Sequence, residues 1–280
     1  MDKTELRTAQ LKLVELLIDI DKICEENNIQ YYMIAGTLLG AIRHEGFIPW
    51  DTDIDLGMMR GDYEKFCRVC NDLLPDKYII YSNKNNKHFH SPKIKIGFRN
   101  TTKRNIKGKA SYYHVNSILS LDVFPLDNAP NDIKLRNKQS KSIKLLKLIS
   151  RIKIRLKYVK TKRSFKEITQ MILRKTAYTI LSPISMKTII NKLEGVMRKY
   201  EHSNTRCVCS MASRYKYSKQ TMETEIYGVP KKVKFEGFFF SAPSNPEEYL
   251  NRLYGDYMKL PKVEDQKSEY ENINIEYIDK

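Results

Sequence analysis

The most constraining feature of this sequence is a run of three aspartates at alternate positions, Asp51, Asp53 and Asp55. In an extended strand, alternate side chains project to the same face. Three like charges on one face repel each other, and a bound divalent cation removes that repulsion. Clustered carboxylate oxygens suit Mg²⁺ or Mn²⁺, which proteins bind together with substrate phosphates. The run therefore predicts metal-assisted chemistry on a phosphate group.

The flanks of this run predict that it belongs to the folded core. Apolar residues precede it at 47–50 and follow it at 56–58, which disfavours a plain surface strand with alternating acids. A further acid, Asp122, stands alone in an apolar run at 120–125. Because an aspartate inside a strand is costly unless it is paired or bound to a metal, we expect Asp122 beside the other carboxylates.

Hydrophobic periodicity predicts an α+β fold, a mixed sheet flanked by helices. We expect a catalytic core over 1–130, a basic helical insertion over 131–205, and a C-terminal part, 206–280, that completes the catalytic domain. Helices are predicted at 4–27, 38–43, 63–74, 133–160, 166–181, 185–200 and 246–253. Strands are predicted at 31–35, 54–58, 78–81, 92–98, 118–124 and 233–240.

The composition indicates a globular protein, with 41% hydrophobic residues in 280. We find no apolar run of the ~18 residues that a membrane-spanning helix needs, and the first residues lack the pattern of a secretory signal. We therefore expect a cytoplasmic protein, with its five cysteines reduced. Cys67, Cys70, Cys207 and Cys209 could together bind zinc, but ordinary burial of these thiols is the favoured interpretation.

The net charge of +17 is concentrated in one segment. Residues 131–176 contain 16 lysines and arginines and only two acids. Such a segment can be a solvated face, a nucleic-acid footprint or a helix that docks on anionic lipid. Only Tyr158 and Phe165 are available for base stacking, which disfavours nucleic acid. A solvated face and contact with anionic lipid both remain open on the charge alone.

Three segments together carry a resemblance to a known family. Residues 36–66 (GTLLGAIRHEGFIPWDTDIDLGMMRGDYEKF), 121–127 (LDVFPLD) and 249–261 (YLNRLYGDYMKLP) closely resemble the signatures of the LicD family. This family belongs to the DNA polymerase beta-like nucleotidyltransferase superfamily. The likeness covers about residues 10–128 and 226–262, and the basic middle lies outside it.

The resemblance implies roles for residues at the matching positions. Gly36 and Thr37 would contact the phosphates of a nucleotide, in agreement with free amides at the start of the helix that we predict there. Asp53 and Asp55 would hold the metal ions, and Asp122 would complete the triad as ligand or as base toward the acceptor hydroxyl. Asp51 would support them as a further ligand.

Three cations accompany these residues. Arg43 is suited to a bidentate grip on a diphosphate, although a plain helix-surface arginine fits as well. Lys93 and Lys95 alternate on a strand that is similar to a lysine-containing strand of the family. One of them would neutralise the charge of the leaving nucleotide, and a solvated strand face is the alternative.

By this resemblance, the reaction would move phosphocholine or a related phosphorylated alcohol from a CDP-linked donor such as CDP-choline. The acceptor would be a sugar hydroxyl of a cell-surface glycan or lipid-linked sugar, with Mg²⁺ or Mn²⁺ as cofactor and CMP as leaving group. Because acceptors in this family are often lipid-linked, the resemblance favours contact of the basic segment 131–176 with anionic lipid at the inner face of a membrane. One rival is a nucleotidyltransferase that adds NMP to a small molecule or protein and releases pyrophosphate. Another is a nucleic-acid-binding module built on the basic helices.

A choline headgroup is commonly held in a cage of aromatic rings. The chain has 18 tyrosines, and conceivable members of such a cage are Tyr31, Tyr32, Trp50, Tyr112 and Tyr113. Abundance alone does not select among them.

Overall fold

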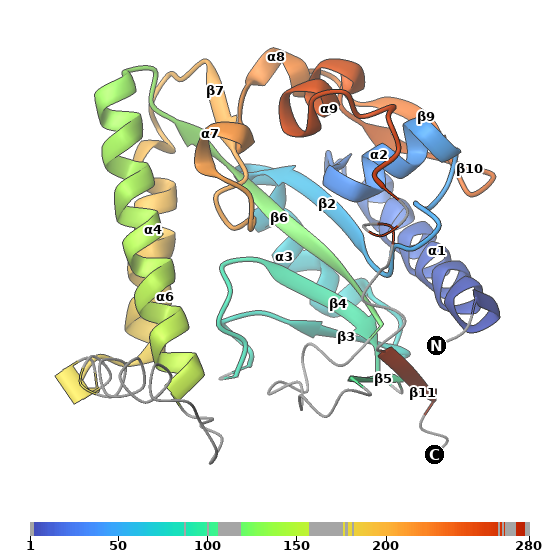
Figure 1. Cartoon of the computed structure of the whole chain (residues 1–280), viewed down its shortest axis with the longest axis horizontal. Helices are drawn as coiled ribbons and strands as arrows, with labels where there is room; N and C mark the ends of the chain where they lie inside the picture. The colour runs from blue at the N-terminus through green and yellow to red at the C-terminus, as the bar shows by residue number, and fades with distance from the viewer. Residues whose placement is uncertain are drawn as a thin grey trace.

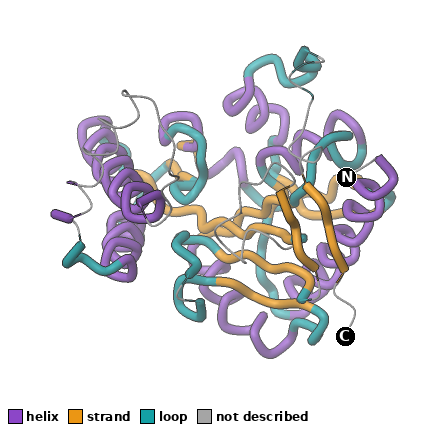
Figure 2. Tube along the Cα trace, turned by 60° about the horizontal axis from the view of Figure 1, so that its bottom comes forward, coloured by secondary structure: helices purple, strands orange, loops and turns teal. Residues whose placement is uncertain are grey.

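A computed structural model describes residues 3–86, 88–99, 101–105, 119–156, 176, 179–180, 182–262, 264, 266 and 273–277. A mixed sheet lies at the centre, with helices on both sides and a separate helical pair at one edge (Figures 1 and 2). The α+β fold class predicted from the sequence is confirmed. Within the described ranges, no helix combines the length and hydropathy that crossing a membrane would need.

The central sheet is built from seven strands: β1 (Tyr32–Met33), β2 (Ile54–Met59), β3 (Tyr78–Tyr81), β4 (Ile94–Phe98), β6 (Ser120–Ala129), β7 (Cys207–Cys209) and β8 (Thr221–Glu223). Their order is β1-β2-β6-β4-β3, with β7 paired to the far end of β6 and β8 paired to β7. The strand pair β5 (Thr101–Asn105) and β11 (Ile273–Tyr277) lies outside this sheet. Residues from the C-terminal part thus extend the sheet of the N-terminal part.

The predicted single strand at 233–240 is wrong. The segment forms a hairpin of β9 (Lys231–Phe235) and β10 (Phe238–Ala242). Its turn residues, Glu236 and Gly237, both have positive φ, 54° and 86°. Because Gly237 adopts that conformation at no steric cost, the chain can reverse there although both flanks are apolar.

Helices cover the sheet on its two faces: α1 (Lys3–Glu26), α2 (Ala35–His44), α3 (Arg60–Leu73), α8 (Thr224–Tyr227) and α9 (Pro246–Tyr254). The buried face of α1 follows the three-to-four spacing of its apolar residues, from Leu6 to Cys24. Helix α2 begins at Ala35, which is earlier than predicted.

A second helical unit stands beside the sheet (Figure 1). It consists of α4 (Ile133–Leu156), α6 (Met186–Met197), the 3₁₀ turn Arg198–Tyr200 and the short α7 (Tyr217–Gln220). Ile143 of α4 and Leu193 and Met197 of α6 share a small core with Cys209 and Tyr217. The helix predicted at 166–181 lies mostly outside the described residues.

The long strand β6 joins these parts. Its first half runs parallel to β2 and antiparallel to β4, with Asp122 opposite both Asp55 and Lys95. Its second half pairs with β7, where Asp127 is opposite Cys209. Register in a sheet fixes which side chains share a face. Acids and a lysine that lie far apart in the sequence are therefore brought into one row across three strands.

A buried ion pair fixes α3 to this strand. Arg60, the first residue of α3, donates through Nε to Asp127 Oδ1 at 2.7 Å and through Nη2 to Asp127 Oδ2 at 2.8 Å. The two side chains are 8% and 1% exposed. Two parallel hydrogen bonds satisfy both oxygens of the carboxylate, so the pair holds β2, α3 and β6 in one arrangement.

We predict that Arg60→Met destabilises the protein by about 3–5 kcal/mol, because it leaves the Asp127 carboxylate buried without a partner. The free energy of unfolding in urea, followed by circular dichroism, measures this. Arg60→Met/Asp127→Asn should recover part of the loss. Lys22→Met breaks the exposed Lys22–Glu26 pair, and should change stability by less than about 0.5 kcal/mol. Equal effects of the two single substitutions would contradict the assignment.

Candidate active site

The structure brings together three aspartates, two on neighbouring strands and one just before the first of these strands. Carboxylate oxygens of Asp53, Asp55 and Asp122 lie within 4.8 Å of one another. Asp55 and Asp122 face each other on β2 and β6, and Asp53 lies one residue before β2 begins. Hard oxygen ligands at this separation fit a divalent cation. Among the described residues, this is the one group of three or more such ligands.

Two lysines of the β4 side balance the charge of Asp122. Lys95 Nζ lies 2.9 Å from Asp122 Oδ1 and donates to Ser120 Oγ at 2.8 Å. Lys93 Nζ forms an ion pair with Asp122 Oδ2 and lies over the ring of Phe124, 4.3 Å from its centroid. Lys93 lines the cavity described below. Of the two predicted lysines, Lys93 is thus the one placed to meet a ligand.

The acids differ in their electrostatic environment. Burial and then the charges of Asp53 and Asp122 raise the pKa of Asp55 well above its ordinary value. Burial also disfavours charge on Asp122, but Lys95 and Lys93 outweigh it and hold the pKa of Asp122 below its ordinary value. Asp55 is therefore the group whose charge a bound cation would stabilise most.

Asp51 lies beside the triad rather than in it. It precedes β2 in the connection from Trp50, so the strand geometry predicted for all three aspartates holds only from Ile54 onward. Burial, followed by the charge of Asp53 and a hydrogen bond with it, raises the pKa of Asp51 to about 8. Asp51 Oδ1 accepts from the backbone N–H of Thr52 at 3.0 Å.

Gly36 and Thr37 connect the start of α2 to these acids. A Cβ atom at position 36 would lie 2.8 Å from Asp51 Oδ2, so a side chain at this position would force the Asp51 carboxylate to shift. Thr37 Oγ1 accepts a hydrogen bond from the backbone N–H of Asp55 at 2.8 Å. The hydroxyl that was predicted to contact phosphate therefore also positions the backbone of a triad residue.

Arg43 lies at the other end of α2. Its Nη1 donates to the backbone carbonyl of Tyr257 at 2.8 Å, and its Nε donates to His44 Nε2 at 3.0 Å. It is not among the described residues that line the cavity. The grip on a diphosphate assigned to it from the sequence stays a prediction.

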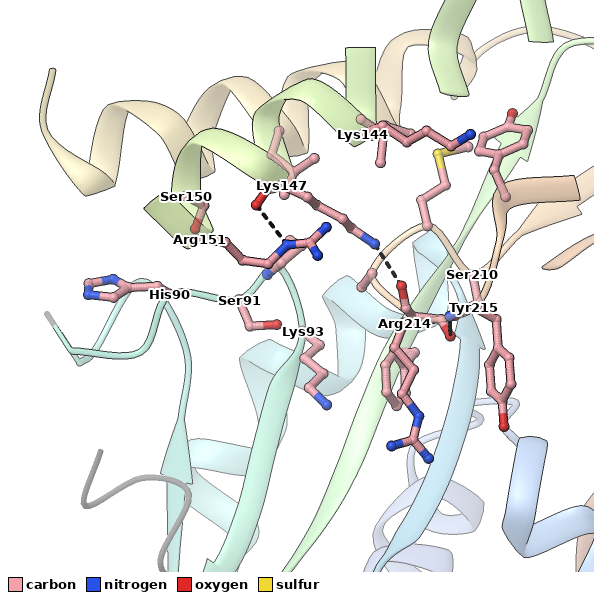
Figure 3. A pocket seen from close by; sticks show the side chains of 18 of the residues that line it. His90, Ser91, Lys93, Lys144, Lys147, Ser150, Arg151, Ser210, Arg214 and Tyr215 are labelled. Carbon is pink, nitrogen blue, oxygen red and sulfur yellow. Dashed lines mark hydrogen bonds between the residues drawn. The ribbon is translucent and has the colours of Figure 1, made fainter. Parts of the chain in front are cut away.

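A cavity of about 920 Å³ opens over the triad. One wall is the sheet, with Asp53, Asp55, Asp122 and Lys93. The opposite wall is α4, and the loop 210–217 closes a third side. Figure 3 shows Lys147 and Arg151 projecting from α4 and Arg214 projecting from the loop. The active-site cavity thus lies between the sheet and the helical unit.

The cavity residues on α4 and on the loop 210–217 were not predicted from the sequence. Lys144, Lys147 and Arg151 were counted within a basic segment whose face was assigned to lipid or solvent. Their spacing of three and four residues was the available signal that they share one helix face. Nothing local marks Arg214 and Tyr215, because they reach the cavity only through the pairing of β7 with β6.

Of the aromatic candidates for a choline cage, the three that the structure describes, Tyr31, Tyr32 and Trp50, do not line the cavity. Tyr31 and Tyr32 are each 2% exposed in the core, with hydroxyls bonded to Asp21 and to the Gly228 carbonyl. They cannot contact a headgroup. Tyr112 and Tyr113 lie outside the described residues. Tyr215 lines the cavity, and its hydroxyl lies 3.1 Å from that of Tyr254.

The two cysteine pairs occupy different elements. Cys67 and Cys70 lie on α3, whereas Cys207 and Cys209 form β7. Burial raises the pKa of Cys70 and of Cys209 to about 12 in each case. These two thiols therefore remain protonated at neutral pH, as small buried apolar groups do.

Comparison with known proteins adds independent information. Residues 28–134 match the LicD/FKTN/FKRP nucleotidyltransferase domain. The matched region contains α2, β2 and the whole acidic triad. The "Ribitol 5-phosphate transferase FKRP" of mouse and of human are each 45% identical to the chain over 40 residues, 14% of this chain and 8% of those proteins.

A bacterial relative matches almost the whole chain. The "Lipopolysaccharide cholinephosphotransferase LicD" of Haemophilus influenzae is 30% identical over 269 residues, which are 95% of this chain and 96% of that protein. The likeness therefore includes the helical unit and the loop 210–217 as well as the catalytic sheet. The chain belongs to the LicD family of phosphotransferases.

Proposed function

We propose that this enzyme transfers phosphocholine, or a closely related phosphorylated alcohol, from a CDP-linked donor to a sugar hydroxyl of a cell-surface glycan or glycolipid precursor. The observation that carries this proposal is the acidic triad, Asp53, Asp55 and Asp122, in a chain that matches a cholinephosphotransferase over nearly its full length. The choline group, the nucleotide and the lipopolysaccharide acceptor come from that relative's activity and from the family resemblance.

We assign the triad to the binding of Mg²⁺, with Mn²⁺ as the alternative. The fit rests on three convergent carboxylates, of which Asp55 resists ionisation while no cation is near. When bound, such a cation neutralises phosphate oxygens and orients them for in-line displacement. Asp51, next to the triad, supports the position of Asp53 and can supply a further oxygen.

The protein's own groups have distinct tasks in this reaction. Thr37 holds the backbone of Asp55, and Lys93 presents positive charge at the cavity surface. The bond from phosphorus to the acceptor oxygen forms, the bond from phosphorus to the CMP oxygen breaks, and the proton of the acceptor hydroxyl passes to solvent. Lys93 and Lys95 form ion pairs with Asp122 and lower its pKa, so its carboxylate is a weak base. We therefore assign Asp122 to metal binding rather than to removal of the acceptor's proton.

Contact with an anionic membrane surface remains part of the proposal. Helix α4 exposes Ile133, Leu135 and Leu145, with exposed fractions of 66%, 44% and 58%, among its lysines. Apolar side chains surrounded by basic ones suit an interfacial helix at the inner face of a membrane. Such contact would bring a lipid-linked acceptor to the cavity.

Product analysis tests the reaction directly. The purified enzyme should convert CDP-choline and a lipopolysaccharide-derived acceptor to CMP and a phosphocholine-bearing product in the presence of Mg²⁺. Chromatography of the nucleotides, with mass spectrometry of the acceptor, measures this. Release of pyrophosphate from CTP in place of CMP would instead support a nucleotidyltransferase.

We predict that Asp53→Asn and Asp55→Asn each lower kcat by roughly 100-fold or more, because even outer partners of a metal site contribute 10- to 100-fold. Steady-state rates of CMP release measure the effect, and circular dichroism checks that the fold persists. Asp72→Asn, at an exposed position on α3, is the matched control and should keep the wild-type rate. Wild-type turnover by either triad variant would refute the assignment.

The acidic cluster also predicts a pH dependence of stability. Asp51 and Asp55 have pKa values above those of an unfolded chain, so the folded state binds more protons between about pH 4 and pH 8. Without metal, stability should therefore fall as pH rises through this window. Melting temperatures in EDTA measure it.

Added Mg²⁺ should stabilise the protein more at pH 8 than at pH 5, because protons compete with the cation for the same oxygens. Asp55→Asn should flatten the pH profile and abolish the response to Mg²⁺. A response to Mg²⁺ that is equal at both pH values, or unchanged in this variant, would place the cation elsewhere.

A further inference from the structure

One face of α4 carries basic side chains into the active-site cavity. Lys144, Lys147 and Arg151 lie three and four residues apart, so they share one face of the helix. All three line the cavity. We call them the α4 basic face. Figure 3 shows Lys147 and Arg151 on the wall opposite the strand that carries Lys93.

The carboxylates of this cavity stand on the opposite wall, in the acidic triad, and not on this face. Among the described residues, no acid forms an ion pair with Lys144, Lys147 or Arg151. Lys147 Nζ donates to the Ser213 carbonyl at 2.7 Å, and Arg151 Nε donates to the Lys147 carbonyl at 3.2 Å. Both acceptors are uncharged carbonyl groups. The remaining N–H groups of Lys147 and Arg151 are therefore available to a ligand in the cavity.

The electrostatic effect of this arrangement is visible at Lys147. The pKa of Lys147 is lowered to about 8, chiefly by burial. Cys209 opposes this shift, whereas the charges of Arg151 and Lys93 add to it. Positive charges gathered without a counter-charge are unfavourable until an anion binds between them. An anion with several oxygens, such as phosphate, matches these donors.

The position of the face indicates which substrate supplies that anion. This step rests on the proposed function. In an in-line displacement, the attacking and leaving oxygens stand on opposite sides of phosphorus. Helix α2, whose start is predicted to contact the nucleotide, and helix α4, which carries the basic face, lie on opposite sides of the β2–β6 pair (Figure 1). The side occupied by α4 is thus the side from which the acceptor attacks.

We propose that the acceptor of this enzyme is anionic and that its phosphate group binds between Lys147 and Arg151 on the α4 basic face. The recognised chemistry is a sugar phosphate whose free hydroxyl points toward the acidic triad. The charge that makes the segment 131–176 basic is therefore used in part for substrate recognition, from inside the cavity.

Binding to the metal-free protein tests this without turnover. The probes are glucose 6-phosphate and glucose, titrated by calorimetry in EDTA. The test variant is Lys147→Met/Arg151→Met, with Arg151→Met alone as a second variant that keeps the Lys147–Ser213 contact. The control, Lys138→Met/Lys141→Met, removes the same charge from exposed positions of the same helix outside the cavity. Melting curves check that each variant is folded.

We expect glucose 6-phosphate to bind the wild type and the control alike, and glucose to bind neither. The test variant should lose at least about tenfold in affinity for glucose 6-phosphate, since a hydrogen bond to a charged group is worth a factor of ten or more. Arg151→Met should show a smaller loss in the same direction. Absence of binding to the wild type, or equal losses in test and control, would overturn the proposal.

Binding of CDP-choline tests the proposed phosphate site on α4 separately from the proposed transferase reaction. With Mg²⁺ present, CDP-choline should bind the test variant within about twofold of the wild type. A selective loss of CDP-choline affinity in the test variant would assign the α4 basic face to the donor's diphosphate and overturn the acceptor assignment. If the wild type binds glucose 6-phosphate through these residues but does not bind CDP-choline, the donor is wrong and the phosphate site stands.

Discussion

Mutual repulsion among clustered carboxylates is the constraint around which this structure is organised. Asp53, Asp55 and Asp122 place their oxygens within 4.8 Å of one another, an arrangement that a fold would otherwise avoid. The register of β2 against β6 forces Asp55 and Asp122 together, and the buried Arg60–Asp127 pair anchors α3 to β6 five residues further along. The energy stored in that repulsion is what makes the site receptive to a cation.

The charge around the triad differs between its two sides, with lysines beside Asp122 and further acids beside Asp55. Lys93 and Lys95 neutralise Asp122, whereas Asp55 and Asp51 have mainly other acids and buried surroundings as neighbours. Positive charge then continues across the cavity to α4. The cavity therefore has two walls of opposite charge. The acids on the sheet favour a bound cation, and the basic residues of α4 favour the phosphate groups of a substrate.

Much of the catalytic half could be predicted from the sequence because its signals are local. The alternation at 51–55, the lone acid at 122 and the amphipathic pattern of α1 each follow from spacing along the chain. The hairpin at 231–242 was missed because its two flanks are both apolar and only Gly237 marks the reversal. The roles of Arg214 and Tyr215 depend on long-range pairing, which no local pattern reports.

The sequence by itself determined most of the secondary structure of the core, the family and the identity of the acids. Strand and helix periodicities and a long motif are local features, so they can be recognised in consecutive residues. Only the tertiary structure decided that Asp51 stands beside the triad, that Lys93 rather than Lys95 reaches the cavity, and that part of the basic segment faces inward. The physical reason is that sheet register and helix docking set distances between residues that are remote in sequence, and those distances decide which charges interact.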